Sequence, residues 1–328
     1  MKKAFLSSLL MLGLLQQGSA QVDPHFSQFY AHPLWLNPAL TGAFEGKLRA
    51  SAIYRSQWAN VSPYNTVGIS ADLRTDDNLN IGVAFLQQSA GDGGYHYQNG
   101  GISMSYSGVR FGADGAQQLF IGMQVGFLGR SFDPDGLRYG SQWSPGTGYD
   151  PTRPPGDNSE QSSSGALDIA AGATWIDTRS DALFQPFAGI SAGHLTQPED
   201  PFFKGSTYHL PLRLTAHGGF RYQVGETARL QVQLLYMRQG SAEERMAGAG
   251  INLAVSDETE LHLGGSYRIG DAVSPYVGVR HGALSLGASY DHTVSGLGKL
   301  AGNTNAFELS LTWIVPGEDG YSIPCPRF

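Results

Sequence analysis

The feature that most constrains this 328-residue chain is a series of short segments in which apolar and polar residues alternate. In residues 119–127, for example, apolar side chains occupy every odd position and glycine or glutamine fills most even ones. A period of two places successive side chains on opposite faces of a β-strand. About fourteen such runs follow one another, near residues 47–56, 65–74, 79–88, 100–111, 118–130, 164–176, 183–195, 210–223, 227–238, 245–255, 258–269, 273–280, 282–291 and 304–314.

The lengths of the connections indicate how these strands are arranged. If the first strand starts in the periplasm, the connections that return there are short, such as 75–78 and 225–226. The opposite ones include 89–99, 131–163, 196–209 and 292–303. Short inner turns, long outer loops and an even number of ~10-residue strands are typical of outer-membrane barrels. We therefore predict an all-β, antiparallel transmembrane barrel of about 14 strands. A soluble sandwich or propeller would also alternate, but its turns need not sort by length.

Composition and the first residues fit an exported membrane protein. Charged residues make up 15% of the chain, against ~25% in soluble proteins. Residues 1–20 have a basic start, an apolar run and small residues before a predicted cleavage between Ala20 and Gln21. The run is shorter than the ~20 residues of a retained anchor. Without Lys2 and Lys3 the net charge is (21 − 2) − 28 = −9, so we expect no nucleic-acid binding.

Arginines on the polar faces of the predicted strands mark the inside of the barrel. On the lipid face near the midplane, each would cost about 2–4 kcal/mol. We therefore predict that they point into the lumen. They are Arg49, Arg55, Arg213, Arg221, Arg268 and Arg280.

No motif predicts catalysis, a metal or a cofactor. Residues 189–193 match G-x-S-x-G, but they lie inside an alternating run without the helix that a nucleophile elbow requires. Residues 133–136 lack the later acidic ligands of a calcium loop and suit a turn. The nine histidines form no H-E-x-x-H, and the single cysteine allows no internal disulfide. We predict a protein that is not an enzyme.

Residues 21–45 form an aromatic, proline-rich segment before the first strand. Its exposed aromatic side chains require burial against the barrel or against a partner. Two interpretations fit equally well, a plug-like extension that stabilises the barrel and a docking element. The predicted layout is a signal peptide over 1–20, a periplasmic segment over 21–45, a barrel over 46–314 and a periplasmic tail over 315–328.

The stretch DPHFSQFYAHPLWLNPALTG resembles the N-terminal signature of the PorP/SprF family of type IX secretion system membrane proteins of Bacteroidota. Members typically begin Q-D-P-x-F-S-Q-F-Y and continue through a proline to L-N-P-A-x-T-G; Val22 is an insertion relative to the commonest spacing. Residues 289–313 are similar to the family's last hairpin, and residues 325–328 to its cysteine-proline tail. The matching N-terminal positions are Gln21, Asp23, Pro24, Phe26, Ser27, Gln28, Phe29, Tyr30, Pro33, Leu36, Asn37, Pro38, Ala39, Thr41 and Gly42.

The resemblance implies an outer-membrane barrel of FadL-like size that supports export and surface attachment of adhesin or gliding-type cargo with a type B C-terminal secretion domain. It also implies outer-membrane lipids and periplasmic partners, either the ring lipoprotein with its companion or a peptidoglycan-binding lipoprotein. We expect cargo to meet Tyr139, Trp143 and Tyr149 in the longest external loop. We expect periplasmic docking by Asp23, Pro24, His25, Phe26, Ser27, Gln28, Phe29, Tyr30, Asn37, Pro38, Ala39, Gly42, Cys325 and Pro326.

A channel or hydrophobic-ligand transporter is the rival function. A 14-strand barrel is intermediate between small barrels filled by side chains and open porins of ~16–18 strands. If the lumen were open, its arginines would pass anions.

Overall fold

The structure is a computed structural model, and it describes residues 23–59, 62–91, 94–133, 137–154, 163–179, 181–199, 209–296 and 304–317. The predicted signal peptide with Ala20 and Gln21, and the tail with Cys325 and Pro326, lie outside the described residues. Among the described residues, none of the helices has the length and apolar character that crossing a membrane needs.

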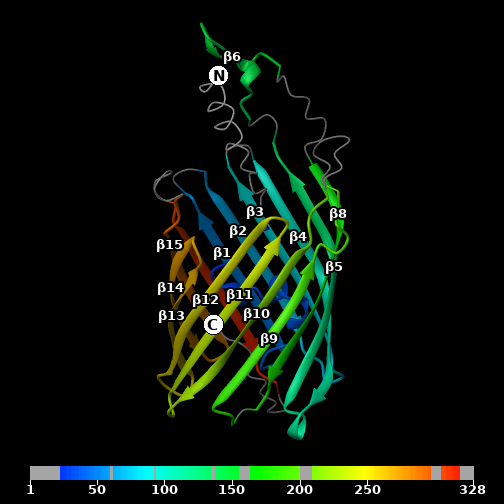
Figure 1. Ribbon diagram of the computed structural model, residues 1–328, viewed down its shortest axis with the longest axis vertical. Coiled ribbons are helices and arrows are strands. Elements are labelled where there is room, and N and C mark those ends of the chain that lie inside the picture. The colour runs from blue at the N-terminus through cyan, green and yellow to red at the C-terminus, as the bar shows by residue number, and fades with distance from the viewer. Residues whose placement is uncertain are drawn as a thin grey trace, which may run out of the picture.

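Fourteen antiparallel strands form a closed barrel, which confirms the predicted fold class. Figure 1 shows these strands arranged around the wall. Each strand pairs with its neighbours along the chain, and β1 closes the wall against β16. The barrel strands are β1 (Leu48–Gln57), β2 (Tyr64–Leu73), β3 (Leu79–Ala90), β4 (Tyr95–Phe111), β5 (Gln117–Ser131), β8 (Ser163–Asp177), β9 (Phe184–Gly193), β10 (Arg213–Val224), β11 (Ala228–Gln239), β12 (Ala242–Ala254), β13 (Thr259–Arg268), β14 (Ala272–His281), β15 (Leu284–Thr293) and β16 (Ala306–Val315).

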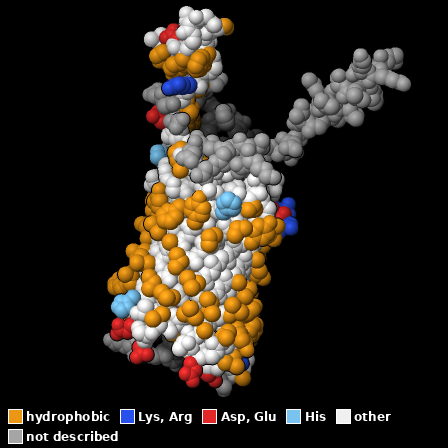
Figure 2. Space-filling view, turned by 90° about the vertical axis from the view of Figure 1, so that its left-hand side faces the viewer, with side chains coloured by type: hydrophobic (Ala, Val, Ile, Leu, Met, Phe, Trp, Pro, Cys, Tyr) orange, Lys and Arg blue, Asp and Glu red, His pale blue; other side chains and the backbone are white. Residues whose placement is uncertain are grey.

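The alternation of each strand separates an apolar outer face from a packed inner face. In β5, Ile121 and Met123 are about half exposed, whereas Gln118 and Phe120 on the other face are fully buried. Figure 2 shows apolar side chains spread over the outside of the wall. Exposed aromatic residues such as Tyr222 lie near strand ends, where membrane barrels carry their interfacial belts.

The two rims of the barrel differ in their connections. One rim, the short-turn rim, carries the connections 74–78, 112–116, 178–183, 225–227, 255–258 and 282–283, and here β1 begins and β16 ends. A short 3-10 helix, η3 (Ala113–Gly115), forms one of these turns. The other, the long-loop rim, carries 58–63, 91–94, 132–162, 194–212, 240–241, 269–271 and 294–305.

The longest connection rises well above the long-loop rim (Figure 1). Its described part contains the 3-10 helix η5 (Gly140–Gln142) and a small hairpin of β6 (Trp143–Ser144) and β7 (Gly148–Tyr149). Within this hairpin the rings of Trp143 and Tyr149 lie 5.7 Å apart, and the Arg138 guanidinium stands 5.2 Å above the Tyr149 ring.

Candidate functional site

The lumen of the barrel is occupied by the segment that precedes β1, residues 23–44, which we call the plug. At the long-loop rim, the backbone N–H of Asp23 donates to Gln239, the last residue of β11, at 2.9 Å. At the short-turn rim, Arg49 near the start of β1 lies over the Phe44 ring at 4.7 Å. The plug therefore runs through the whole barrel from one rim to the other.

Local sequence chemistry gives the plug its compact shape. It folds into η1 (Phe29–Ala31), α2 (Pro33–Leu36) and η2 (Pro38–Leu40). Prolines 33 and 38 stand at helix starts, where the missing N–H costs nothing. The Asn37 side chain caps η2 by accepting from the N–H of Ala39 at 2.9 Å. Gly42 then turns the chain with a φ of 73°, a conformation that favours glycine.

Apolar side chains of the plug pack against inward-facing residues of the wall. Phe29, Tyr30, Leu36 and Leu40 form a buried cluster with wall residues that include Phe120 of β5. A second cluster joins Phe26 and Ala31 to Leu210 of the connection before β10 and to wall residues Ile53, Leu86, Tyr97 and Leu128. The aromatic residues of the segment are thus buried inside the barrel, where full burial of one large apolar side chain contributes roughly 1.5–3 kcal/mol.

Glycines in the wall provide the room that the plug occupies. A Cβ added at Gly122 of β5 would lie 2.5 Å from the backbone of Ala39, and one at Gly172 of β8 would lie 2.1 Å from the Asn37 side chain. Distances below about 3.0 Å require the neighbouring atoms to move. The wall is therefore shaped for this plug at these positions.

A buried charge network fixes the upper part of the plug to the first and last strands. Glu308 of β16 accepts the backbone N–H of Ser27 at 2.7 Å and pairs with Arg55 of β1. Asp291 of β15 accepts the Ser27 hydroxyl at 2.7 Å and pairs with both Arg55 and Arg268. The side chains of all four charged residues are at most 4% exposed. Since every charge has an opposite partner, the network avoids the cost of an unpaired buried ion.

Asp23 belongs to a second buried cluster at the long-loop rim. His194, which follows β9, lies between the carboxylates of Asp23 and Asp168, and Arg213 approaches Asp23 at 3.3 Å. Burial alone would raise the pKa of Asp23, but His194 and Arg213 hold it well below its usual range. Burial alone would lower the pKa of His194, but the two carboxylates raise it to about 9. Asp23 and His194 therefore form an ion pair at neutral pH.

Polar residues in the middle and lower plug also find partners on the wall. The Asn37 amide donates to the carbonyls of Ala173 and Ile190, which belong to neighbouring strands. It also lies 3.1 Å from a ring nitrogen of His217, whose other nitrogen is 3.0 Å from the Tyr30 hydroxyl. Near the short-turn rim, Arg49 donates to the carbonyl of Leu40 and pairs with Asp72.

The structure places the predicted docking residues inside the barrel instead of at its periplasmic mouth. Each of those within the described residues lies in the lumen, and Asp23 stands at the rim opposite the one where β16 ends. The physical reason is the density of partners that the wall offers to both the aromatic and the polar side chains. Most of their side chains are buried against the wall while the plug is seated. This position corresponds to the plug-like interpretation of the segment.

The predicted lumen arginines take different positions. Four of them contact the plug: Arg49, Arg55, Arg213 and Arg268. Arg221 is buried in β10, and Arg280 pairs with Glu260 at 3.0 Å near the short-turn rim. Tyr139, Trp143 and Tyr149 lie together in the loop above the opposite rim.

Four other residues that bond the plug were not among the predicted residues. Glu308, Asp291, His194 and His217 connect the plug to the wall. Glu308 stands at an inward position of an alternating strand, so its place in the lumen could have been inferred. Its contact with Ser27, 281 residues earlier, has no local signal in the sequence.

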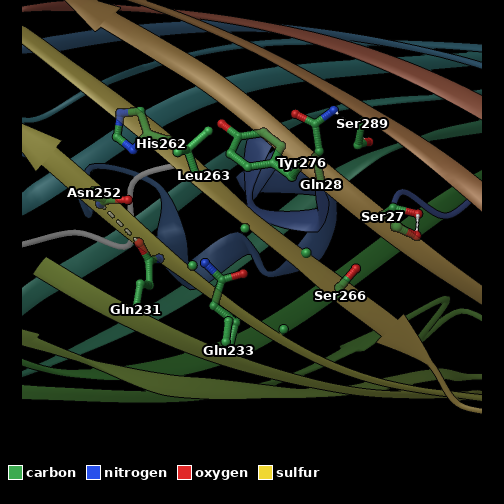
Figure 3. A pocket seen from close by; sticks show the side chains of 16 residues that line it. Ser27, Gln28, Gln231, Gln233, Asn252, His262, Leu263, Ser266, Tyr276 and Ser289 are labelled. Carbon is green, nitrogen blue, oxygen red and sulfur yellow. Dashed lines mark hydrogen bonds between the residues drawn. The ribbon is translucent and has the colours of Figure 1, made fainter.

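A small polar cavity remains between the plug and the β11–β15 side of the wall (Figure 3). Its volume is about 50 Å³, room for a few water molecules. Glycines 248, 250 and 264 line part of it, together with polar side chains. The labelled polar residues around it are Ser27, Gln28, Gln231, Gln233, Asn252, His262, Ser266, Tyr276 and Ser289.

The other motifs have structural positions. Ser191 of the G-x-S-x-G match lies within β9, and its hydroxyl donates to the carbonyl of Leu36 in the plug at 2.9 Å. Within the described part of the chain, no group of three or more histidine, cysteine or acidic residues could hold a metal ion.

The fold and the lumen define a class, a closed 14-strand membrane barrel filled by its own N-terminal segment. A family model described as type IX secretion system membrane protein PorP/SprF matches residues 18–313. The chain therefore belongs to the PorP/SprF family, and its barrel is consistent with the outer membrane. This confirms the resemblance seen at the two ends of the sequence. No curated protein matches it.

Several solved structures match this chain. The Ralstonia pickettii toluene transporter TbuX is 9% identical, with 89% of this chain and 94% of TbuX covered and a TM-score of 0.51. For the Pseudomonas putida toluene transporter TodX the identity is 9%, the coverage 85% and 91%, and the TM-score 0.47. For a Pseudomonas aeruginosa FadL homologue these values are 13%, 84% and 92%, and 0.43. At 9% identity, the likeness to TbuX shows the fold alone.

Proposed function

We propose that this barrel is a non-enzymatic mount of the type IX secretion system, which holds an exported surface protein at its long-loop rim. The observation that supports a mount is the plug. A lumen filled by an anchored segment leaves no wide route for diffusion, whereas a closed, rigid wall is a stable base for a bound protein. The assignment to the type IX secretion system comes from the family to which the chain belongs.

The orientation follows the usual rule for outer-membrane barrels, with short turns in the periplasm and long loops outside. The tail after β16 then leaves on the periplasmic side. The plug, by contrast, brings Asp23 to the external rim. The motif residues of the plug therefore act by closing the barrel, and docking of periplasmic components falls to the short turns and the tail.

The exported cargo, with its type B C-terminal secretion domain, would contact the hairpin of β6 and β7. Trp143 is 55% exposed there, next to Tyr149. Exposed aromatic residues are frequent anchors of protein–protein interfaces. Their position high above the membrane suits a large partner.

The periplasmic ring lipoprotein with its companion, or a peptidoglycan-binding lipoprotein, would meet the opposite rim. Exposed carboxylates gather on these turns, some of them visible at the bottom of Figure 2. A partner with basic residues fits such a surface. The exposed acidic residues are Asp76, Asp77, Asp181, Glu226, Asp257 and Glu258.

A loop replacement in the native bacterium tests the mount. Residues 137–154 are exchanged for a glycine-serine linker of equal length, and heat-modifiable mobility on gels checks that the barrel still folds. We expect a surface protein with a C-terminal secretion domain to move from the cells to the medium. If all such proteins stay cell-bound while the barrel is folded, the proposal that the barrel is a mount is wrong.

Transport of a hydrophobic ligand is the second candidate, because a cavity lies beside the plug. Its lining of serine, glutamine and asparagine side chains suits water better than a hydrocarbon. Reconstitution into planar bilayers and liposomes separates the two functions. We expect no sustained conductance and no uptake of toluene by the intact protein; either activity would favour the transporter.

A further inference from the structure

One strand of the wall, β8, is only partly paired on one of its sides by the described residues. β8 pairs with β5 over all its residues, but only residues 171–176 pair with β9. β9 ends early because His194 takes a φ of 56° and bonds Asp23 and Asp168 in the lumen. Residues 163–168 of β8 therefore extend above β9 at the long-loop rim.

The backbone of this extension presents unpaired groups. In an antiparallel strand, alternate residues direct their N–H and C=O to the same side. On the β9 side, the carbonyl of Ile169 accepts from the N–H of Leu195, and that of Leu167 accepts from the Thr196 hydroxyl. Ser163 and Gly165 direct their backbone groups to this same side, and within the described residues nothing pairs with them there.

The edge also lacks the features that usually protect such strands. Exposed edges commonly carry lysine, proline or a bulge, whereas residues 163–167 read Ser-Ser-Gly-Ala-Leu. A Cβ added at Gly165 would have no atom within 4 Å, and Leu167 is 57% exposed. Among the described residues, Ser163 and Gly165 therefore offer an incoming strand free backbone groups, and Gly165 offers it space.

We propose that residues 163–167 of β8 bind the exported surface protein by taking up one of its extended segments as an additional antiparallel strand. This inference rests on the proposed mount and specifies where the cargo is held. The site lies at the rim that the cargo would occupy. Its uncharged edge fits an uncharged segment of four or five residues, since five strand residues span about 17 Å. Backbone pairing supplies affinity in this mode of recognition.

Two substitutions at one position separate the backbone from the side chain. Gly165→Pro removes the N–H that faces the open edge and breaks no bond within the barrel, whereas Gly165→Ala keeps that N–H. The measured quantity is the fraction, in the medium, of the surface protein that the 137–154 replacement releases. We expect at least a tenfold rise with proline and none with alanine. Retention in a folded proline variant, or equal release by both, overturns the inference.

Photo-cross-linking covers the case in which the proline variant does not fold. A benzophenone amino acid replaces Leu167 at the edge or, as a control, the similarly exposed Ile121, which lies within β5 and is paired on both sides. We expect the same surface protein to cross-link from position 167 and not from 121. Absence of that product, or a cross-link only to this chain's own residues, overturns the inference.

The proposed mount and the proposed strand addition at β8 can be refuted separately. If the loop replacement releases cargo but both edge experiments are negative, the mount stands and strand addition is wrong. If the loop replacement releases nothing from a folded barrel, the mount itself fails and the inference fails with it.

Discussion

Replacing Glu308 by alanine should loosen the plug without opening the wall. Glu308 is fully buried, and it accepts the N–H groups of Ser27 at 2.7 Å and Gln28 at 2.9 Å. Each hydrogen bond to a charged group contributes about 1.5–3 kcal/mol. Arg55 keeps Asp291 as a partner and Arg268 also has Asp271 at 3.4 Å, so neither cation is left without a carboxylate. We therefore expect the seated state of the plug to lose about 3–5 kcal/mol.

The assay follows transient opening of the plug in native outer membranes. Cys325 is replaced by serine, and Ala31, a 5% exposed plug residue, by cysteine, so that the probe is the only thiol. Because each 1.4 kcal/mol is a factor of ten, the maleimide labelling rate should rise roughly a hundredfold to a few thousandfold.

The matched control is Glu243→Ala. The Glu243–Arg245 pair is exposed, and such pairs contribute at most about 1 kcal/mol. This variant should change the labelling rate no more than about fivefold. A Glu308→Ala barrel that labels within tenfold of its parent would refute the role of the charge network.

Three further predictions address the same plug. Gly122→Leu should push the plug out of its seat, because a Cβ there would lie 2.5 Å from the Ala39 backbone; labelling at position 31 should rise by more than tenfold, while Gly165→Ala, with open space, should leave it unchanged. The raised pKa of His194 stabilises the seat fully below its unfolded value of ~6.5, and this contribution is lost as pH rises through about 9; protease cleavage of the plug should therefore increase between pH 8 and 10.5, and an equal increase in His194→Gln would contradict this origin. Deleting residues 23–44 should convert a silent barrel into one that conducts in planar bilayers, and a folded deletion variant without conductance would show that something else closes the lumen.

The wall could be predicted closely from the sequence because its signal is local. Each strand shows a period of two within about ten residues, and each turn marks the next reversal. The predicted run 79–88 became β3 (Leu79–Ala90), and 118–130 became β5 (Gln117–Ser131). The largest shift is at the start of β4, predicted at 100 and observed at Tyr95. The start of β10, predicted at 210, is observed at Arg213, because Pro211 cannot donate to a ladder.

The path of the plug could not be predicted, because its partners are remote. The aromatic residues of the segment indicated that it is buried, but they did not indicate whether it packs against the barrel or against a partner. Inside a 14-strand wall, the choice between mouth and lumen depends on the volume that residues such as Gly122 and Gly172 leave free. It also depends on pairs such as Ser27 with Glu308, which no periodicity reports.

The plug precedes all the barrel strands in the sequence, and this has a consequence for how the barrel assembles. Ser27 and Gln28 belong to the first part of the chain, and they bond Glu308 in the last strand, 281 and 280 residues away. Contacts so distant form late, because the chain must first close a long loop. Until β16 joins β1, Arg55 and Glu308 face each other across an open seam. The bonds that hold Ser27 and Gln28 can therefore form only when β16 closes the seam with β1.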